Sequence, residues 1–99
     1  MWRPDLSGVA HNMYYVYIIQ SEKDKSWYYG FSEEPEKRLA YHNAGKATYT
    51  KSKIPWKLIF LRSFEIETEA LKFERYLKNT RNKKFIEREF SVFFKKDVS

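Results

Sequence analysis

Glu74 is a carboxylate in a stretch whose other residues have the spacing of an apolar helix face. The apolar positions recur at i, i+3 and i+7, at Ala70, Phe73 and Leu77. A carboxylate in such surroundings must find a cation, a metal ion or a hydrogen-bond donor, or else take up a proton. The pattern therefore predicts a functional role for Glu74. The alternative is that Glu74 lies at the edge of the stripe and pairs in water with Arg75 or Lys78.

Arg38 and His42 are a second pair that could do chemistry. They lie four residues apart in residues 33–43, which carry helix signals: acidic residues first, Pro35 in the opening turn and Gly45 after the end. Side chains with this spacing project from one helix face, where they could bind one phosphate group together. The alternative is that the two cations only stabilise the carboxyl end of the helix dipole.

A predicted β-hairpin contains five tyrosines: Tyr14, Tyr15, Tyr17, Tyr28 and Tyr29. A buried phenolic hydroxyl needs a hydrogen-bond partner, so we expect some of these hydroxyls to face a wet cleft. We take Gln20 and Trp27 as the pair that flanks the hairpin loop. Ile19 then lies opposite Tyr28, and Tyr17 points to the same face of the sheet as Tyr28. A shift of one residue would separate them, and in the alternative interpretation most of the five are core residues.

Basic side chains outnumber acidic ones, with 19 Lys and Arg against 13 Asp and Glu and a net charge of +6. Such a surface attracts the phosphates of nucleic acids, and Tyr49 and Trp56 offer rings on which bases could stack. The candidate nucleic-acid-binding residues are Lys46, Lys51, Lys53, Arg75, Lys78 and Arg81. The alternative is a solvated charged face that binds nothing.

Composition excludes several other classes of protein. The chain has no cysteine and only two histidines, so disulfides and cysteine-based zinc sites are excluded. Its 99 residues fit one domain, which we place at residues 13–94, with tails at 1–12 and 95–99. No run of about 18 apolar residues occurs, and the first residues lack the apolar core of a signal peptide. We therefore expect a cytoplasmic protein that has no membrane partner.

The order of predicted elements is β-β-α-β-α-α, an α+β fold. The expected elements are strands at 14–20 and 27–31, a helix at 33–43, a basic loop at 44–57, a strand at 58–64, a helix from a Thr68 cap to about 78, a turn at 79–82 and a helix at about 83–94. The hairpin strands lack clean alternation, which predicts a sheet covered by helices on both faces. The strand at 58–64 is apolar enough to lie in the middle of that sheet.

Four separated motifs together resemble the GIY-YIG family, in particular its small single-domain bacterial group of endonuclease-like proteins. They are Tyr15-Val16-Tyr17, Tyr28-Tyr29-Gly30, Arg38-Leu39 with His42-Asn43-Ala44-Gly45, and Glu74 within residues 70–78. The resemblance extends over about residues 13 to 90 and rests on the order of all four motifs. It implies a three-stranded antiparallel sheet flanked by helices, in agreement with the predicted elements.

The resemblance also implies an activity and a site. Members cut phosphodiester bonds with one divalent metal ion, so the implied cofactor is Mg²⁺ or Mn²⁺, bound by Glu74. By the same resemblance, Tyr17 and Tyr28 would position or deprotonate the attacking water, and which of them is the base stays open. Arg38 would stabilise the charge on the phosphorus centre, and His42 would assist at the same phosphate.

Three departures from the family pattern concern rate and specificity more than fold. Tyr29 stands where an aliphatic residue is usual, Phe31 is bulky beside the site, and residues 79–84 replace a glycine-containing turn.

The expected function is a metal-dependent endonuclease whose partner is nucleic acid, DNA in preference to RNA, with branched, damaged and single-stranded DNA as candidate substrates. The alternatives are a catalytically silent nucleic-acid-binding module and a nuclease subunit that needs a protein partner. We expect a monomer.

Overall fold

A computed structural model describes residues 13–95 of the chain. The elements are β1 (Tyr14–Ser21), β2 (Trp27–Ser32), α1 (Pro35–Asn43), a 3-10 turn (Lys51–Lys53), β3 (Trp56–Phe64), α2 (Glu67–Thr80), α3 (Lys83–Glu89) and a second 3-10 turn (Ser91–Phe93). The predicted α+β class and the order β-β-α-β-α-α are confirmed. The predicted tails lie outside the described residues except for Lys95, whose backbone N–H donates a hydrogen bond to the carbonyl of Ile59 at 2.8 Å.

The three strands form one antiparallel sheet in the order β2-β1-β3. Ile19 lies opposite Tyr28 and Gln20 opposite Trp27, so the predicted hairpin register is confirmed. Tyr17 and Tyr28 therefore point to the same face. The prediction that residues 58–64 form the middle strand is wrong, because β1 occupies that position. The apolar content of β3 instead reflects cover on both of its faces, since Phe60 and Leu61 point to opposite sides and are both buried.

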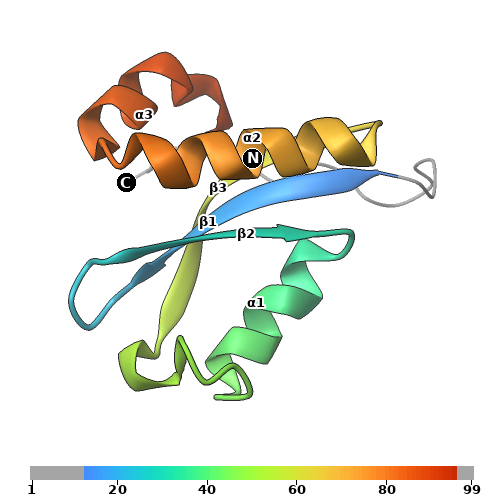
Figure 1. Cartoon of the computed structure of the whole chain (residues 1–99). Helices are drawn as coiled ribbons and strands as arrows, with labels where there is room; N and C mark the ends of the chain where they lie inside the picture. Colours follow the sequence, from blue (N-terminus) through green and yellow to red (C-terminus); the bar gives the residue numbers. More distant parts are fainter. Residues whose placement is uncertain (1–12, 96–99) are drawn as a thin grey trace.

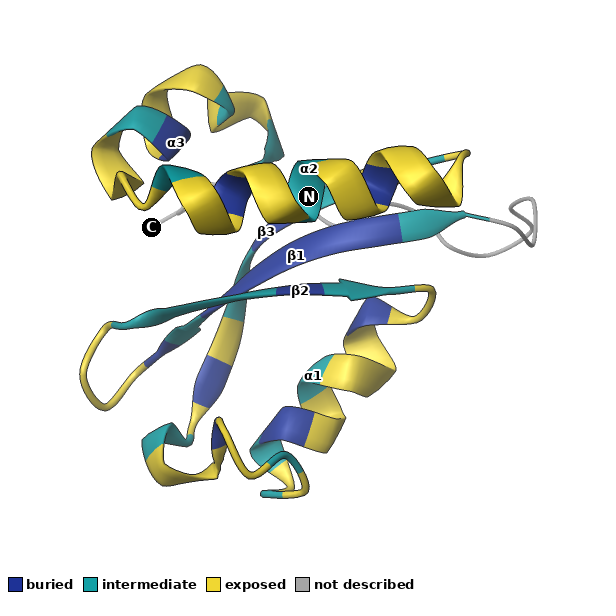
Figure 2. Cartoon of the chain, in the orientation of Figure 1, coloured by how far each residue is buried: buried dark blue, intermediate teal, exposed yellow. Residues whose placement is uncertain are grey.

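Helices cover both faces of the sheet, as the lack of alternation in its strands predicts. In Figure 1, α2 and α3 lie over one face and α1 over the other. The core under α2 and α3 is built on Val16, Ile18, Phe60, Ala70, Leu77 and Ile86. The core on the α1 side is built on Tyr15, Tyr17, Ile19, Trp56 and Leu61. The buried residues accordingly follow β1 and the inner sides of the helices in Figure 2, and alternate residues of β1 supply one core each.

Helix ends differ from the sequence predictions at the start of α1, at both ends of α2 and at the end of α3. Thr68 does not cap α2, because it lies inside the helix, which begins at Glu67, and Ile66 occupies the cap position without a side-chain hydrogen bond. The last helix is shorter than predicted: α3 ends at Glu89, and a 3-10 turn replaces its last residues. At its start, the side chain of Asn82 accepts a hydrogen bond from the N–H of Phe85 at 3.0 Å, which caps the helix.

Candidate active site

Tyr17 lies at the centre of the candidate site. It belongs to the middle strand and is 1% exposed. Its hydroxyl lies 3.0 Å from Nε2 of His42, at the end of α1. Its ring lies directly over Gly30 of the neighbouring strand, where a Cβ atom would come within 2.2 Å of Cζ of the tyrosine. The sheet register and the glycine therefore fix the phenol ring, and α1 fixes its hydrogen-bond partner.

His42 is the most deeply buried polar residue of the site, at 1% exposed. Its Nδ1 lies 2.8 Å from Oγ1 of Thr50, and the Thr50 hydroxyl is oriented to donate to the carbonyl of Ala47 at 3.5 Å. Thr50 then accepts from Nδ1–H, which leaves Nε2 as an acceptor for the Tyr17 hydroxyl. Burial, reinforced by the positive charge of Arg38, lowers the pKa of His42. The neutral imidazole is therefore the form present at neutral pH.

The charges of three other predicted site residues reach Tyr17. Burial is the main cause that raises the pKa of Tyr17 to about 12, and the neighbouring Tyr28 adds to it. The nearby guanidinium of Arg38 opposes this rise in pKa, whereas the carboxylate of Glu74 raises the pKa further. The fold thus brings Tyr17 of β1, Tyr28 of β2 and His42 of α1 into contact, and the charges of Arg38 and of Glu74 on α2 act on Tyr17.

Glu74 lies at the border of the apolar stripe of α2. Its side chain is 17% exposed, and its Oε2 lies 3.3 Å from Nζ of Lys78, one helical turn later. The alternative interpretation was that Glu74 pairs with Arg75 or Lys78 in water. Lys78 is indeed its partner, but the Glu74 side chain is mostly shielded from water. Its charge also reaches Tyr17.

A divalent metal ion suits Glu74 only if most of its ligands come from elsewhere. No three His, Cys, Asp or Glu side chains converge anywhere in residues 13–95. Mg²⁺ is commonly held by one or two carboxylates together with substrate phosphates and water. A single, largely buried carboxylate fits such an open site, and it does not fit a closed structural metal site.

Tyr28 of β2 connects the site to two aromatic side chains from other parts of the chain, Tyr49 of the loop after α1 and Trp56 of β3. Its ring centroid lies 5.0 Å from that of His42, 6.1 Å from that of Tyr49 and 6.4 Å from that of Trp56. Arg38, which is exposed, stacks over the Tyr41 ring at 4.5 Å. The arginine therefore lies at the mouth of the site, in water, while His42 lies at its floor.

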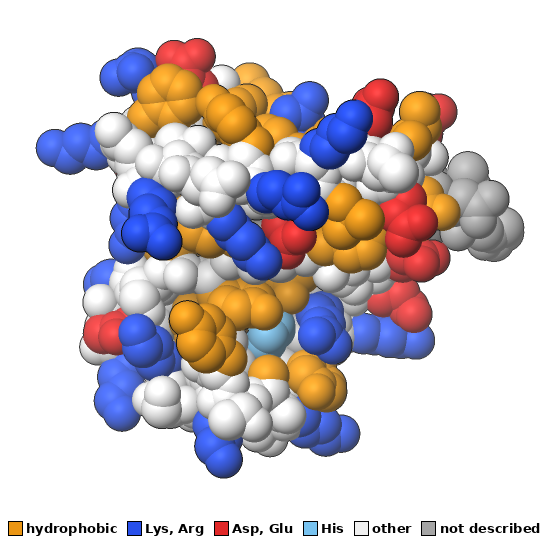
Figure 3. Space-filling model, in the orientation of Figure 1, with side chains coloured by type: hydrophobic (Ala, Val, Ile, Leu, Met, Phe, Trp, Pro, Cys, Tyr) orange, Lys and Arg blue, Asp and Glu red, His pale blue; other side chains and the backbone are white. Residues whose placement is uncertain are grey.

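The candidate nucleic-acid-binding residues divide into two groups. Two of them form ion pairs: Lys78 with Glu74, and Lys53 with Asp24 at 3.2 Å. The remaining four are exposed: Lys46, Lys51, Arg75 and Arg81. Lys and Arg side chains gather around a hydrophobic patch between α2 and α1 on the face shown in Figure 3. The basic charge is therefore concentrated around the candidate site on this face.

Sequence reasoning missed three residues that position the site. Thr50 orients His42, and Gly30 makes room for the Tyr17 ring. Asn43 joins the end of α1 to the start of β3, because its side chain donates to the Trp56 carbonyl at 2.9 Å and accepts from the Trp56 N–H at 2.7 Å. Gly30 and Asn43 stood within the motifs but were given no role, whereas Thr50 acts through a loop whose path no sequence pattern gave.

Comparison with known proteins identifies the family. Residues 13–88 match the family model described as the GIY-YIG catalytic domain. The chain belongs to the GIY-YIG family. The GIY-YIG domain is a nuclease domain and is generally metal-dependent, which agrees with a site built around one carboxylate, one arginine and a buried tyrosine. A nuclease domain also implies that the chain binds nucleic acid.

Curated GIY-YIG relatives are small bacterial proteins. UPF0213 protein YazA of Bacillus subtilis is 42% identical over 74% of this chain and 74% of its own length. UPF0213 protein CPE1444 of Clostridium perfringens is 45% identical over 73% of this chain and 78% of its own. The solution structure of UPF0213 protein BH0048 from Bacillus halodurans has a TM-score of 0.51 and 31% identity, and the match covers 81% of this chain and 84% of that one. No helix within residues 13–95 is long and apolar enough to span a membrane.

Replacing Gly30 with Ala should disrupt the site by displacing the Tyr17 ring. A methyl group there would lie 2.2 Å from Cζ and 2.3 Å from the hydroxyl oxygen of Tyr17, which is too close for either group to stay in place. We expect Gly30→Ala to lower the free energy of unfolding by about 1–3 kcal/mol, the usual cost of overpacking a core. Urea denaturation of Gly30→Ala beside wild type measures this, and equal stability of the two proteins would contradict the geometry.

Proposed function

We propose that this GIY-YIG domain is a metal-dependent endonuclease that hydrolyses phosphodiester bonds in DNA. The active site comprises Tyr17, Tyr28, Arg38, His42 and Glu74. The observation that carries the proposal is the hydrogen bond between the Tyr17 hydroxyl and the neutral His42, within reach of the charges of Arg38 and Glu74. A structural core tyrosine also needs an acceptor for its hydroxyl, but it does not need a guanidinium and a carboxylate near that hydroxyl.

The hydrogen bonds give Tyr17 a way to take a proton from water. A phenol whose pKa is raised to about 12 keeps its proton at neutral pH, so it is a base only if its own proton leaves. Nε2 of His42 is the acceptor for that proton, at 3.0 Å. As the water oxygen bonds to phosphorus and the leaving P–O bond breaks, the water proton passes to the Tyr17 oxygen and the phenolic proton passes to His42. The leaving alkoxide takes a proton from solvent.

Arg38 and Glu74 act on charge rather than on protons. Arg38 offers N–H donors at the mouth of the site, where they stabilise the negative charge that grows on the phosphate oxygens. Glu74 would hold the divalent ion, Mg²⁺ or Mn²⁺, with water and phosphate oxygens as the other ligands. When bound, this ion supplies Lewis-acid polarisation of a phosphate oxygen.

One observation favours a second candidate function, a nucleic-acid-binding module without catalysis. The ion pair between Glu74 and Lys78 satisfies the carboxylate without a metal ion. A pure binding module would bind DNA through its exposed basic residues and lose affinity in high salt, as would the nuclease. Metal-dependent cleavage separates the two functions.

Cleavage of labelled single-stranded, duplex, flap and four-way-junction DNA with Mg²⁺ or Mn²⁺ tests the proposed function. We expect wild type to cut at least one of these substrates, and Arg38→Ala to cut it about 10²–10³ times more slowly, the usual effect of removing one donor to a charged transition state. Lys37→Ala is the matched control, because Lys37 is an exposed cation of the same helix that pairs with Glu34 at 2.9 Å. Binding of every substrate without cleavage of any would support the binding module instead.

A further inference from the structure

Two neighbouring hollows lie beside the proposed active site and are lined mainly by aromatic side chains. The smaller has a volume of about 180 Å³ and is lined by Ser26, Trp27, Tyr28, Tyr49, Thr50, Lys53 and Trp56. The larger has a volume of about 460 Å³ and is lined by Trp27, Tyr28, Tyr29, Tyr49 and Lys78. Both hollows include Tyr28, and neither includes Arg38, His42 or Glu74.

Tyr49 is the residue that the proposed chemistry leaves unexplained. It is 84% exposed, the most exposed large apolar side chain within residues 13–95. Its ring contacts the Tyr28 ring, with centroids 6.1 Å apart at an angle of 61°. A lone exposed aromatic residue needs no explanation, but Tyr49 lines both hollows together with Trp27 and Tyr28. Its ring therefore offers a free face to a flat, apolar ligand.

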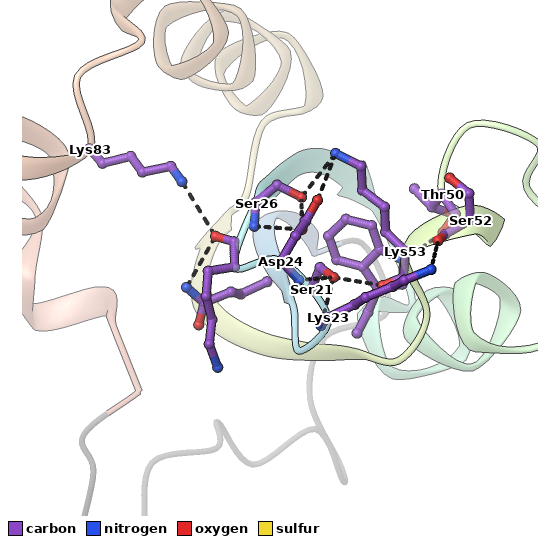
Figure 4. Close-up of polar contacts among 11 residues, drawn as sticks. Ser21, Lys23, Asp24, Ser26, Thr50, Ser52, Lys53 and Lys83 are labelled. Carbon is purple, nitrogen blue, oxygen red and sulfur yellow. Dashed lines mark hydrogen bonds and ion pairs between the residues drawn. The ribbon is translucent and has the colours of Figure 1, made fainter.

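The walls of these hollows are held in place by polar contacts of the hairpin loop. Nζ of Lys53 lies 3.2 Å from the Asp24 carboxylate and 3.3 Å from Oγ of Ser26, and Oγ of Ser21 donates to the Lys53 carbonyl at 2.7 Å. Figure 4 shows these side chains joining the loop after β1 to the segment that follows Tyr49. On the other side, Lys83 lies over the Trp27 ring at 5.1 Å. The hollows are thus built before any ligand binds.

Charge and position indicate which ligand fits. Lys53 and Lys78 each line one hollow, and Lys78 also contacts Glu74 of the proposed site. Rings flanked by cations are the usual binding surface for unpaired bases, which stack on the rings while the cations attract the adjoining phosphates. A base within a duplex is already stacked on both sides, so it cannot place a face on Tyr49 without leaving the helix.

We propose that the hollows around Tyr49 bind an unpaired DNA base next to the phosphate that is cut, and so direct the protein to single-stranded DNA. This inference rests on the proposed function for the position of the cut, because Tyr28 belongs to both the hollows and the site. Tyr49 and Trp27 stack on the base, and Lys53 and Lys78 attract its flanking phosphates. The specificity of the protein then resides in residues that take no part in proton transfer.

Binding measurements with Tyr49→Ala test the inference without relying on cleavage. The protein carries Glu74→Gln throughout, and the probes are one oligonucleotide containing 2-aminopurine, as a single strand and as a duplex. We expect Tyr49→Ala to weaken single-strand binding about 5- to 140-fold, the effect of losing one stacked base, and to relieve the quenching of 2-aminopurine. Duplex binding should change less than about twofold, because phosphate contacts dominate it.

Two variants serve as controls. Tyr49→Phe keeps the ring and should bind as the parent protein does, whereas Tyr76→Ala removes an exposed tyrosine that lines neither hollow and should leave the preference for single strands unchanged. Equal losses on single strand and duplex, or no loss in Tyr49→Ala, would overturn the inference. Failure of this inference can be told apart from failure of the proposed nuclease. If the wild-type protein cleaves DNA but Tyr49→Ala still prefers single strands, only the role of the hollows is rejected. If the protein prefers single strands through Tyr49 but cleaves nothing, only the nuclease is rejected.

Discussion

Replacing Glu74 with Gln is expected to abolish cleavage while leaving DNA binding intact. The substitution keeps the size of the side chain and an oxygen that can accept from Nζ of Lys78, now 3.3 Å from the carboxylate. It removes the charge that would hold the metal ion, whose stabilisation of the transition state is worth several kcal/mol. We therefore expect the cleavage rate to fall by about 10³-fold or more. Single-turnover cleavage with Mg²⁺ and with Mn²⁺ measures the loss.

A measurement of DNA binding shows whether Glu74→Gln loses catalysis or only loses affinity. Glu74→Gln raises the net charge by one from +6, so attraction to DNA should be equal or stronger, and a slower reaction cannot be blamed on weaker binding. Glu69→Gln is the matched control, because Glu69 is an exposed carboxylate of the same helix and its loss changes the net charge equally. If Glu74→Gln cut as fast as Glu69→Gln, the ion pair with Lys78 would be the whole role of Glu74.

The sequence predicted the parts of the fold that depend on local pattern. The hairpin register follows from the pairing of Gln20 with Trp27, and it places Tyr17 and Tyr28 on one face. The strand order was not accessible in the same way, because an apolar strand such as β3 can be buried by helices on both faces at the edge of a sheet as well as in its middle. Thr68 likewise has a side chain typical of a helix cap, but the cap of α2 lies two residues earlier, at Ile66, so residue type did not fix the start of the helix.

The sequence predicted which residues form the candidate site, but it did not predict their burial or their hydrogen-bond partners. The spacing of Arg38 and His42 suggested two side chains on one phosphate, yet the structure gives them different environments: Arg38 is exposed, and His42 is buried between Tyr17 and Thr50. The i, i+4 rule places side chains on one helix face and says nothing about what lies above that face. Burial by the 47–56 segment is a tertiary effect, and it makes His42 a proton acceptor rather than a cation.

Tyr17→Phe provides the test of that proton-acceptor role. The ring remains over Gly30, so the core is preserved, but the hydroxyl 3.0 Å from Nε2 of His42 is removed. We expect the cleavage rate to fall about 10²–10⁴-fold, the usual contribution of a positioned acid or base. The free energy of unfolding should fall by about 1–3 kcal/mol, because Nε2 of a buried imidazole loses its donor. Tyr15→Phe is the control, since Tyr15 lies in the same strand and core and is 5% exposed.

The pH dependence of cleavage separates a proton relay from a structural hydrogen bond. Burial lowers the pKa of His42 from 6.5, so the wild-type rate should persist as the pH falls through 6.5 and then decline when His42 gains a proton and can no longer accept one. The contribution of His42 to stability is likewise lost on the acid side, because the imidazole is protonated more easily in the unfolded chain. Tyr17→Phe has no phenolic proton to pass on, so its residual rate should lack the acid limb that wild type and Tyr15→Phe share. An acid limb of the same midpoint in Tyr17→Phe would assign the hydrogen bond a structural role and make Tyr28 the base.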